Sequence, residues 1–363
     1  MRQIPLVDLS RQLEQIRSEV EKGWAAVLDE SNYILGGPVA EFESSFAKFC
    51  DVESCVGVAN GTDAIELILR ACGLGPGDEV LIPANTFIAT ALAVLRASAE
   101  VRLVDCDPES HLIDEHNALE RQTAKTVAVI PVHLFGQMAP CEQIANQEGW
   151  VVIEDAAQAQ GARREGRSIG SFGVAAATSF YPGKNLGAFG DAGAVLTNDP
   201  DLASKVTALR NWGSTEKYHH PEVGFNSRLD TLQAVVLSAK LAKLAQWNEE
   251  RVKAASFYDQ MIGDRAKLPV TLPGNDHVFH LYVIEVDDRD DVMVKMRRAG
   301  IGVGVHYPVP IHLQGALSEL GHKKGDFPNT ERAAERMLSL PIFPGITESE
   351  QDQVVAALFS ALR

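Results

Sequence analysis

The sequence predicts an α/β protein in which a mostly parallel sheet lies between helices, followed by a smaller C-terminal α/β domain. The first supporting observation is that short apolar runs alternate with helical segments between residues 55 and 198, a pattern typical of parallel sheets. The second is that these runs are nearly continuously apolar, as expected when helices cover both faces of a sheet. The third is the length of 363 residues, which favours about two domains.

The N-terminal region is predicted to be helical before the first strand begins. Apolar residues recur there at helical spacings of three and four, at Leu13, Ile16, Val20, Trp24 and Val27. Two glycines and a proline interrupt this pattern in residues 32–39, and a second helix is predicted over 39–50.

The remaining elements follow from the same patterns. In the sheet region, strands are expected at 55–60, 79–84, 100–105, 126–135, 151–156, 176–182 and 192–198, and helices at 64–73 and 87–97. A long helix over 231–262 leads to a second region, with strands at 280–286 and 300–307 and helices near 290–299, 330–338 and 348–362. We place the boundary near residue 240, which gives a large domain of residues 1–240 and a small C-terminal domain of residues 241–363.

Composition narrows the class of partner. The net charge of −16 disfavours nucleic acid, although helix termini still allow a small phosphate ligand. The five cysteines are an odd number without a CxxC pair, so we expect reduced thiols, no structural metal site and a cytoplasmic protein. Neither a signal-peptide core nor a bilayer-length apolar run is present, and no membrane association is expected.

The first segment with chemical content is ANGTDAIELIL, at 59–69. A strand is expected to end at Asn60, and Gly61 and Thr62 then precede a helix, which is how an anion site is built from free backbone amides. The alternative is a plain strand–turn–helix in which Asp63 only starts the helix.

The second segment, VVIEDAAQAQGA at 151–162, ends a buried strand in Glu154 and Asp155. Ligands of open α/β sheets sit beyond the carboxyl ends of strands, where a carboxylate can pair with a protonated ring nitrogen. The alternative is a surface cap for the next helix.

The third segment is SFYPGKNLGAFGDAGAVLTN, at 179–198. Lys184 lies in a glycine-rich turn after a strand that Ser179 closes, where partial burial would lower its pKa and free the amine to attack a carbonyl. The alternative is a solvated surface lysine. Together and in this order, the three segments match the phosphate cradle, the acid and the lysine that pyridoxal phosphate requires.

The chain resembles the DegT–StrS family of nucleotide-sugar aminotransferases, which are fold-type-I pyridoxal-phosphate enzymes. The resemblance covers residues 4–347, and its most specific parts are NGTDA (60–64), IPVHLFG (130–136), EDAAQAQGA (154–162), SFYPGKNLG (179–187) and GFNSRLDTLQA (224–234). The resemblance implies that Lys184 holds the cofactor as a Schiff base and shuttles the proton during catalysis. It implies that Asp155 pairs with the pyridine nitrogen and that Gln158 bonds the phenolic oxygen of the cofactor.

The resemblance also assigns the other cofactor contacts. Gly61, Thr62 and Ser179 match the phosphate cradle, and Phe87 matches the aromatic residue that stacks on the cofactor ring. Asn226 matches a residue that reaches the phosphate from a partner subunit, which implies a homodimer with shared active sites.

Substrate contacts are expected from several segments. His306, Tyr307 and His312, in GVGVHYPVPIHLQ, are candidates for lining the sugar pocket, and a metal site is disfavoured because acids are lacking nearby. Tyr181 and His219 are weaker candidates, with loop residues as the alternative. Arg228 either positions substrate phosphates or forms an interface salt bridge.

The implied reaction moves an amino group from glutamate to a nucleotide-linked keto sugar, with pyridoxamine phosphate as the intermediate form of the cofactor. Gln158, where relatives acting at carbon 4 often carry histidine, and the xPxVDL pattern at Pro5–Leu9 favour a dTDP-3-keto-6-deoxyhexose. UDP-linked 3-keto or 4-keto sugars, a keto-cyclitol and a non-catalytic regulatory role remain alternatives. A dehydratase of the family is disfavoured, because those enzymes replace the lysine with histidine.

Overall fold

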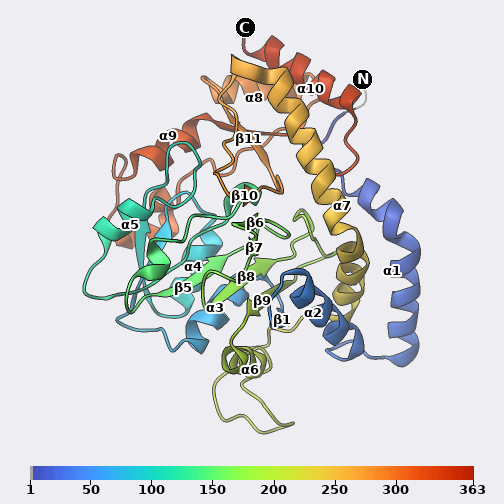
Figure 1. Cartoon of the computed structure of the whole chain (residues 1–363), viewed down its shortest axis with the longest axis vertical. Helices are drawn as coiled ribbons and strands as arrows, with labels where there is room; N and C mark the ends of the chain where they lie inside the picture. The colour runs from blue at the N-terminus through green and yellow to red at the C-terminus, as the bar shows by residue number, and fades with distance from the viewer. Residues whose placement is uncertain (1–2) are drawn as a thin grey trace.

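A seven-stranded sheet forms the centre of the computed structural model, which describes residues 3–363 (Figure 1). Its strand order is β1 (Ser54–Val58), β9 (Gly193–Thr197), β8 (Ala175–Ser179), β5 (Val151–Asp155), β4 (Thr126–Val129), β2 (Glu79–Pro83) and β3 (Glu100–Val104). Strand β9 is antiparallel to both of its neighbours, and the other pairings are parallel. The predicted α/β class with a mostly parallel sheet is therefore confirmed.

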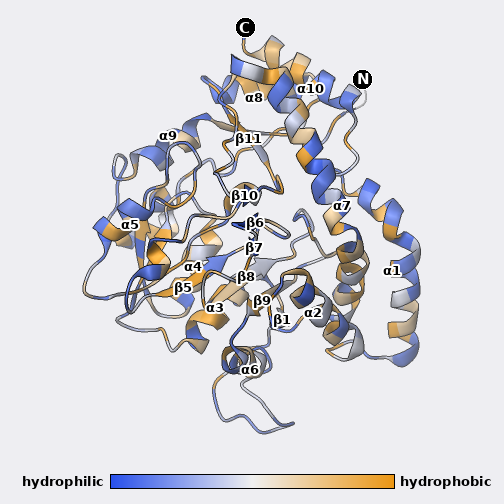
Figure 2. Cartoon of the chain, in the orientation of Figure 1, coloured by the Kyte–Doolittle hydropathy of each residue, from blue (hydrophilic) through white to orange (hydrophobic). Residues whose placement is uncertain are grey.

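Helices pack on both faces of this sheet. The helices α3 (Gly61–Ala71), α4 (Ile88–Arg96) and α6 (Pro200–Leu209) share one apolar core with the strands. The helices α2 (Gly37–Phe49) and α7 (Thr231–Ile262) share a second core with them, and α1 (Ser10–Glu30) packs on α7. Figure 2 shows α3 as mainly hydrophobic and the outer α1 as mainly hydrophilic, in accordance with these positions.

The C-terminal region has a core of its own. Strands β11 (Tyr282–Glu285) and β12 (Met337–Leu340) form an antiparallel pair, which α8 (Arg289–Arg298), α9 (Pro328–Arg336) and α10 (Glu348–Ala361) surround. The last turns of α7 contribute Tyr258 and Ile262 to this core. Residue 240 lies inside α7, which contacts α1 and α2 on one side and α10 on the other, so the exact domain boundary stays a prediction.

Three predicted elements were wrong in extent or type. Within residues 3–363, the predicted strand at 300–307 makes two isolated bridges, Ile4 with Ile301 and Gly304 with Ser339, in place of a strand ladder. The N-terminal segment crosses it so closely that a Cβ at Gly302 would lie 2.6 Å from the Leu6 nitrogen.

The other two corrections concern element ends. The helix predicted over 330–338 stops at Arg336, because the apolar residues that follow pair with β11 as strand β12. The strand predicted over 126–135 ends at Val129, and the chain continues as a loop and a short 3-10 helix, Leu134–Gly136.

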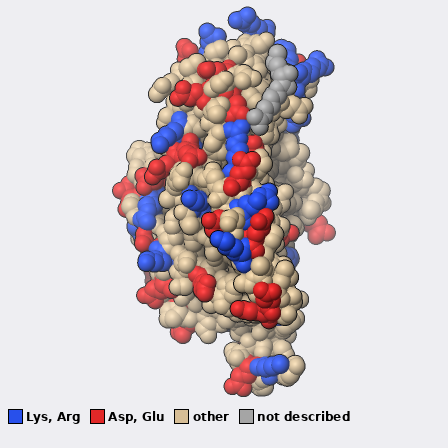
Figure 3. Space-filling model, turned by 90° about the vertical axis from the view of Figure 1, so that its right-hand side faces the viewer, with Lys and Arg blue, Asp and Glu red and all other residues tan. Residues whose placement is uncertain are grey.

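The surface and the thiols bear on the other expectations from composition. Within residues 3–363, none of the helices combines the length and apolar character that a membrane crossing requires. Figure 3 shows basic and acidic side chains interspersed on the face that carries α1 and α7, without a continuous basic patch. All five cysteines are free thiols, as expected.

Glu154, near the end of β5, is an ionised group in the interior. Its side chain is fully buried and accepts hydrogen bonds from the amides of Gly170, Phe172 and Gly173 at 2.9–3.0 Å and contacts His133 Nε2 at 2.9 Å. Burial opposes ionisation, but the His133 imidazole and these amides hold the pKa of the Glu154 carboxyl below its ordinary value. This carboxylate ties β5 to the segment that leads into β8.

The substitution Glu154→Ala is expected to lower the free energy of unfolding by about 3–5 kcal/mol, because it leaves His133 and the buried amides without their acceptor. Denaturant unfolding followed by tryptophan fluorescence measures this change. Glu148→Ala, at an exposed glutamate, is the matched control and is expected to change stability by less than about 0.5 kcal/mol. Equal effects of the two substitutions would contradict the assigned role of Glu154.

Candidate active site

A cavity of about 560 Å³ lies at the carboxyl ends of the central parallel strands. This edge is where open α/β sheets bind ligands. Its polar lining residues are Asn60, Thr62, Thr86, Thr90, Asp155, Gln158, Ser179, Tyr181, Lys184, Asp191, His280, His306 and Tyr307. Most of the cofactor residues expected from the sequence thus come together in one place.

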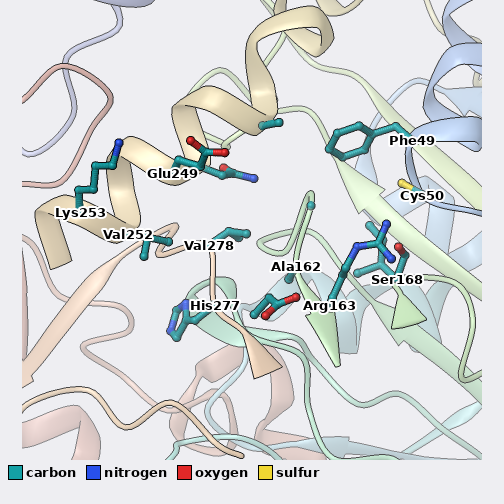
Figure 4. Close-up of a pocket in the computed structure, with 15 residues that line it drawn as sticks. Phe49, Cys50, Ala162, Arg163, Ser168, Glu249, Val252, Lys253, His277 and Val278 are labelled. Carbon is teal, nitrogen blue, oxygen red and sulfur yellow. The ribbon is translucent and has the colours of Figure 1, made fainter. Parts of the chain in front are cut away.

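A second cavity of similar volume lies between α7, the end of α2 and the segment 161–169 (Figure 4). Glu249, Val252 and Lys253 line it from α7, and Cys50 lies on the opposite side. Burial raises the pKa of the Cys50 thiol, so this sulfur stays protonated and is a poor nucleophile. The residues that match the cofactor contacts expected from the sequence line the first cavity.

The N-terminus of α3 forms one wall of the first cavity. Asn60 caps this helix by accepting a hydrogen bond from the Asp63 amide at 2.8 Å, and the first-turn amides of Gly61 and Thr62 point out of the helix end as donors. Ser179, at the end of β8, lies so close that a Cβ added to Gly61 would be 2.7 Å from the Ser179 Cβ. The amides and the hydroxyl together make a cradle suited to a phosphate group.

Asp155 ends β5 on the cavity floor and is 5% exposed. Its carboxylate accepts a hydrogen bond from the Thr90 hydroxyl at 2.8 Å and from the Ala157 amide at 3.2 Å. Burial raises the pKa of Asp155, and these bonds and the nearby Lys184 charge offset only part of that rise. A protonated ring nitrogen would supply the cationic partner that such a desolvated carboxylate favours.

Lys184 lies in the turn that follows β8. Its backbone amide donates to the Tyr181 carbonyl at 2.8 Å, and a side chain at Gly187 would collide with the Pro182 carbonyl, so the turn is tightly closed. Burial lowers the pKa of Lys184 to about 8, against the opposing effect of Asp155. Roughly a tenth of this amine is therefore uncharged at pH 7 and able to act as a nucleophile or base.

Gln158 and two aromatic residues form another side of the cavity. The Gln158 Oε1 accepts from the Phe135 amide at 2.7 Å, and its Nε2 donates to the Tyr307 hydroxyl at 3.0 Å. The rings of Tyr307 and Phe87 lie with centroids 5.3 Å apart, and Phe87 is 53% exposed. An accessible aromatic face of this kind suits a planar heteroaromatic ring.

These groups fit pyridoxal phosphate on chemical grounds. Its phosphate would be held by the donors of Gly61, Thr62 and Ser179, its ring nitrogen by Asp155, and its aldehyde carbon by Lys184. The fit rests on a helix-end donor set and a desolvated carboxylate, both observed in the fold.

Four of the expected residues lie outside the lining of this cavity in the same chain, and three of them come from one segment. Asn226, Arg228 and His219 belong to the segment 211–228, part of which projects below α6 in Figure 1. Arg228 donates to Asn226 Oδ1 at 2.9 Å and to Asn211 Oδ1 at 3.2 Å.

The histidines expected in the sugar pocket separate in the structure. His306 lines the cavity and contacts Ser339 Oγ at 2.8 Å, and burial together with the Lys184 charge lowers its pKa to about 4. His312 is instead buried outside the lining, with its Nε2 at 3.0 Å from Glu331 Oε1. Tyr181 lines the cavity and is 58% exposed.

Several lining residues were missed by sequence reasoning. Thr90 donates to Asp155 from the start of α4, and the two residues are 65 positions apart, so the local sequence pattern gives no sign of this contact. Leu6 and Val7 line the cavity because the N-terminal segment folds back over the C-terminal region. His280 lies at the start of the predicted strand 280–286. A histidine at one end of an apolar run was the sequence signal that could have identified it as a lining residue.

Comparison with known proteins points to the same cofactor chemistry. The profile of the DegT/DnrJ/EryC1/StrS aminotransferase family matches residues 14–359. The chain is 42% identical over 360 residues to dTDP-3-amino-3,4,6-trideoxy-alpha-D-glucose transaminase of Streptomyces venezuelae, covering 98% of this chain and 95% of the relative. It is 41% identical to UDP-N-acetyl-3-dehydro-alpha-D-glucosamine 3-aminotransferase of Acidithiobacillus ferrooxidans, covering 98% and 97%. A relative from Geobacillus stearothermophilus, named pleiotropic regulatory protein, is 44% identical, covering 97% and 96%.

Solved structures agree with these relatives. The crystal structure of S. venezuelae DesV in complex with a ketimine intermediate superposes with a TM-score of 0.97 at 41% identity and covers all of both chains. The structure of NtdA from Bacillus subtilis with bound cofactor PMP has a TM-score of 0.93 at 31% identity, covering 100% of this chain and 86% of that one.

The substitution Lys184→Ala is expected to abolish the absorption band of the lysine-bound cofactor and to reduce amino transfer by roughly 10⁴-fold, since general acid–base catalysis alone contributes up to this factor. Absorbance spectra and a coupled activity assay measure the two effects. Lys253→Ala, at an exposed lysine on α7, is the control and is expected to leave both readouts unchanged. Wild-type turnover by Lys184→Ala would exclude the assigned role.

Proposed function

Because the chain belongs to the DegT/DnrJ/EryC1/StrS aminotransferase family, we propose that it transfers an amino group from glutamate to a nucleotide-linked 3-keto sugar, with a dTDP-3-keto-6-deoxyhexose as the preferred acceptor. The protein is a pyridoxal-phosphate-dependent aminotransferase of a family whose members act on nucleotide sugars.

The position of Gln158 is the observation that carries the choice of carbon 3. This glutamine occupies the fourth residue after Glu154 in EDAAQA, and its amide donates to Tyr307 in the cavity. The names of the relatives from S. venezuelae and A. ferrooxidans both specify nitrogen at carbon 3. Their nucleotides differ, and a UDP-linked 3-keto sugar is therefore the second candidate acceptor.

The roles of the residues follow from their surroundings. When bound, pyridoxal phosphate supplies the electron sink that stabilises negative charge on the reacting carbon. Lys184, with a pKa of about 8, accepts a proton from that carbon in one direction and returns it in the other, because both of its forms are populated near neutral pH. Asp155 would keep a positive charge on the ring nitrogen, and Tyr181, Tyr307 and His306 line the cavity that the acceptor would enter.

The acceptor is tested by incubating the pyridoxamine-phosphate form of the protein with a panel of dTDP- and UDP-linked 3-keto and 4-keto sugars. We expect amination of the dTDP-linked 3-keto sugar, identified by mass and NMR, with the UDP-linked 3-keto sugar as a slower substrate. Exclusive amination of 4-keto sugars would contradict the assignment from Gln158. The same panel without protein controls for spontaneous reaction.

We also infer that the active unit is a homodimer in which Asn226 serves the cavity of the other subunit. The position of Asn226 outside the cavity of its own chain supports this arrangement, and family resemblance assigns it to the partner's phosphate site. Arg228, which bonds Asn226 and lies with its guanidinium carbon 4.1 Å from the Trp212 ring centroid, holds the segment in place.

A complementation experiment tests shared sites. Lys184→Ala and Asn226→Asp are each expected to be nearly inactive as homodimers, the latter because its carboxylate repels the cofactor phosphate. Co-expression with two different tags yields a heterodimer in which one site carries both substitutions and the other carries neither. This heterodimer is expected to have about half of wild-type activity. A heterodimer without activity would show that each site is built from one chain.

A further inference from the structure

Two buried threonines connect the start of α4 to Asp155. Thr90 is 0% exposed and Thr86 is 2% exposed, and both line the first cavity. The Thr90 hydroxyl lies 2.8 Å from Oδ2 of Asp155 and 2.8 Å from the Thr86 hydroxyl. Thr86 belongs to the loop between β2 and α4, and Thr90 to the first turn of α4. Both contacts join groups that are buried in the protein interior.

The direction of these hydrogen bonds follows from the acid at their end. An ionised carboxylate can only accept, so Thr90 gives its single hydroxyl hydrogen to Asp155. The hydrogen between the two threonines then comes from Thr86. The result is a hydrogen-bond relay from Thr86 through Thr90 to Asp155. Successive donors polarise one another, so Thr86 strengthens the bond that Thr90 makes to the carboxylate.

The relay also fixes the orientation of the carboxylate. Thr90 holds Oδ2, and the Ala157 amide holds Oδ1 at 3.2 Å. Within residues 3–363 these are the two hydrogen-bond donors to the Asp155 side chain, and each oxygen keeps capacity for another. Rotation of the carboxyl group would break a buried bond, which is costly because no water replaces the lost donor.

The groups around Asp155 show why a neutral donor matters there. Burial raises the pKa of Asp155, and the Thr90 hydroxyl opposes this rise more than the Ala157 amide, Lys184 or His133 do. The Asp155 charge in turn adds to the effect of burial in raising the pKa of Tyr307. The other titratable residues that line the cavity are Tyr181, Asp191, His280 and His306. Lys184 is expected to react with the cofactor, so the Thr90 hydroxyl is the more constant partner of the acid.

We propose that Thr90, supported by Thr86, is the positioning residue of Asp155, which orients the carboxylate and keeps it ionised so that the shared proton lies on the ring nitrogen of the cofactor. The physical reason is that a carboxylate that already accepts a strong hydrogen bond is a weaker base. The inference rests on the proposed function, because it presupposes that Asp155 pairs with the ring nitrogen. No covalent bond other than that to the shared proton is involved.

Two substitutions at Thr90 separate this role from packing. Thr90→Val replaces the hydroxyl with a methyl group of similar shape, and Thr90→Ser keeps the hydroxyl. Thr207→Val is the matched control, since Thr207 is an exposed helical threonine of α6 whose hydroxyl donates to the Ala203 carbonyl. Equal thermal unfolding temperatures of the two Thr90 variants would establish that both fold.

The first readout needs no activity. Solid-state ¹⁵N NMR of bound pyridoxal phosphate, labelled at the ring nitrogen, reports whether that nitrogen carries the proton. We expect the ratio of protonated to unprotonated nitrogen to fall about 10-fold in Thr90→Val, because Asp155 loses a hydrogen bond to its charged form. Thr90→Ser and Thr207→Val are expected to resemble wild type. An unchanged ratio in Thr90→Val would overturn the proposal.

Thr86→Val keeps the bond between Thr90 and Asp155 but removes the outer donor. It is expected to shift the same ratio in the same direction by a smaller factor. This variant also tests the relay if Thr90→Val does not fold, and a shift in the opposite direction would contradict the proposal.

The second readout is the kinetics of the two half-reactions. Thr90→Val is expected to reduce kcat of both about 10-fold with little change in KM, and Thr90→Ser is expected to restore most of the loss. The protein is then loaded with a cofactor analogue that has C–H in place of the ring nitrogen. Thr90→Val is expected to cause no further loss with this analogue, because there is no ring proton to place. Equal losses with both cofactors would assign Thr90 a structural role and overturn the proposal.

Asp155→Asn distinguishes failure of the proposal from failure of the proposed function. Wild-type turnover by Asp155→Asn would show that the pairing with the ring nitrogen itself is wrong. If Asp155→Asn is inactive while Thr90→Val matches wild type in both readouts, the positioning role alone fails.

Discussion

Desolvation of two opposite charges in one cavity is the constraint on which the site depends. Asp155 and Lys184 stand at the ends of neighbouring parallel strands, β5 and β8, and the sheet order brings them to the same edge. Burial raises the pKa of Asp155 and lowers the pKa of Lys184, so it favours the neutral form of each group. The charge of each group partly offsets this shift in the other. The pair is thereby left with unsatisfied affinity for a partner of the opposite kind, a cationic ring nitrogen for the acid and an electrophilic carbon for the amine.

Two adjacent acids on one strand have different roles, one in stability and one at the ligand cavity. Glu154 and Asp155 follow each other in β5, and consecutive side chains of a strand point to opposite faces. Glu154 faces the interior, where amides and His133 satisfy its oxygens, so it is fixed and chemically silent. Asp155 faces the cavity with fewer donors and a raised pKa, so it remains available for a ligand.

The sequence was sufficient for the sheet, the helices that cover it and the cofactor residues that lie close to strand ends. Gly61, Thr62, Asp155, Ser179 and Lys184 each follow or precede an apolar run, and that local pattern places them at one edge. Contacts between residues far apart in the sequence could not be predicted from such local patterns. His280 meets Asn185 from 95 residues away, and Thr90 meets Asp155 from 65 residues away.

Glycine-rich or short apolar segments were also misjudged, because their conformation is decided by what packs on them. The segment 300–307 has the composition of a strand, yet the N-terminal segment crosses it at Gly302. His312 shared a motif with His306 and Tyr307, but the chain turns between them and buries it against Glu331.

The helix α7 has a mechanical consequence. It runs for 32 residues, from Thr231 to Ile262, without a glycine or proline, which corresponds to a rod about 48 Å long. Its first half lies on the cofactor-binding sheet and its last turns belong to the C-terminal core, with Asn248 and Arg251 between them. One uninterrupted helix thus packs against both cores, and through Asn248 it also holds Asn185, the residue next to Lys184. A shift of the C-terminal core along this helix would therefore be felt at the lysine loop.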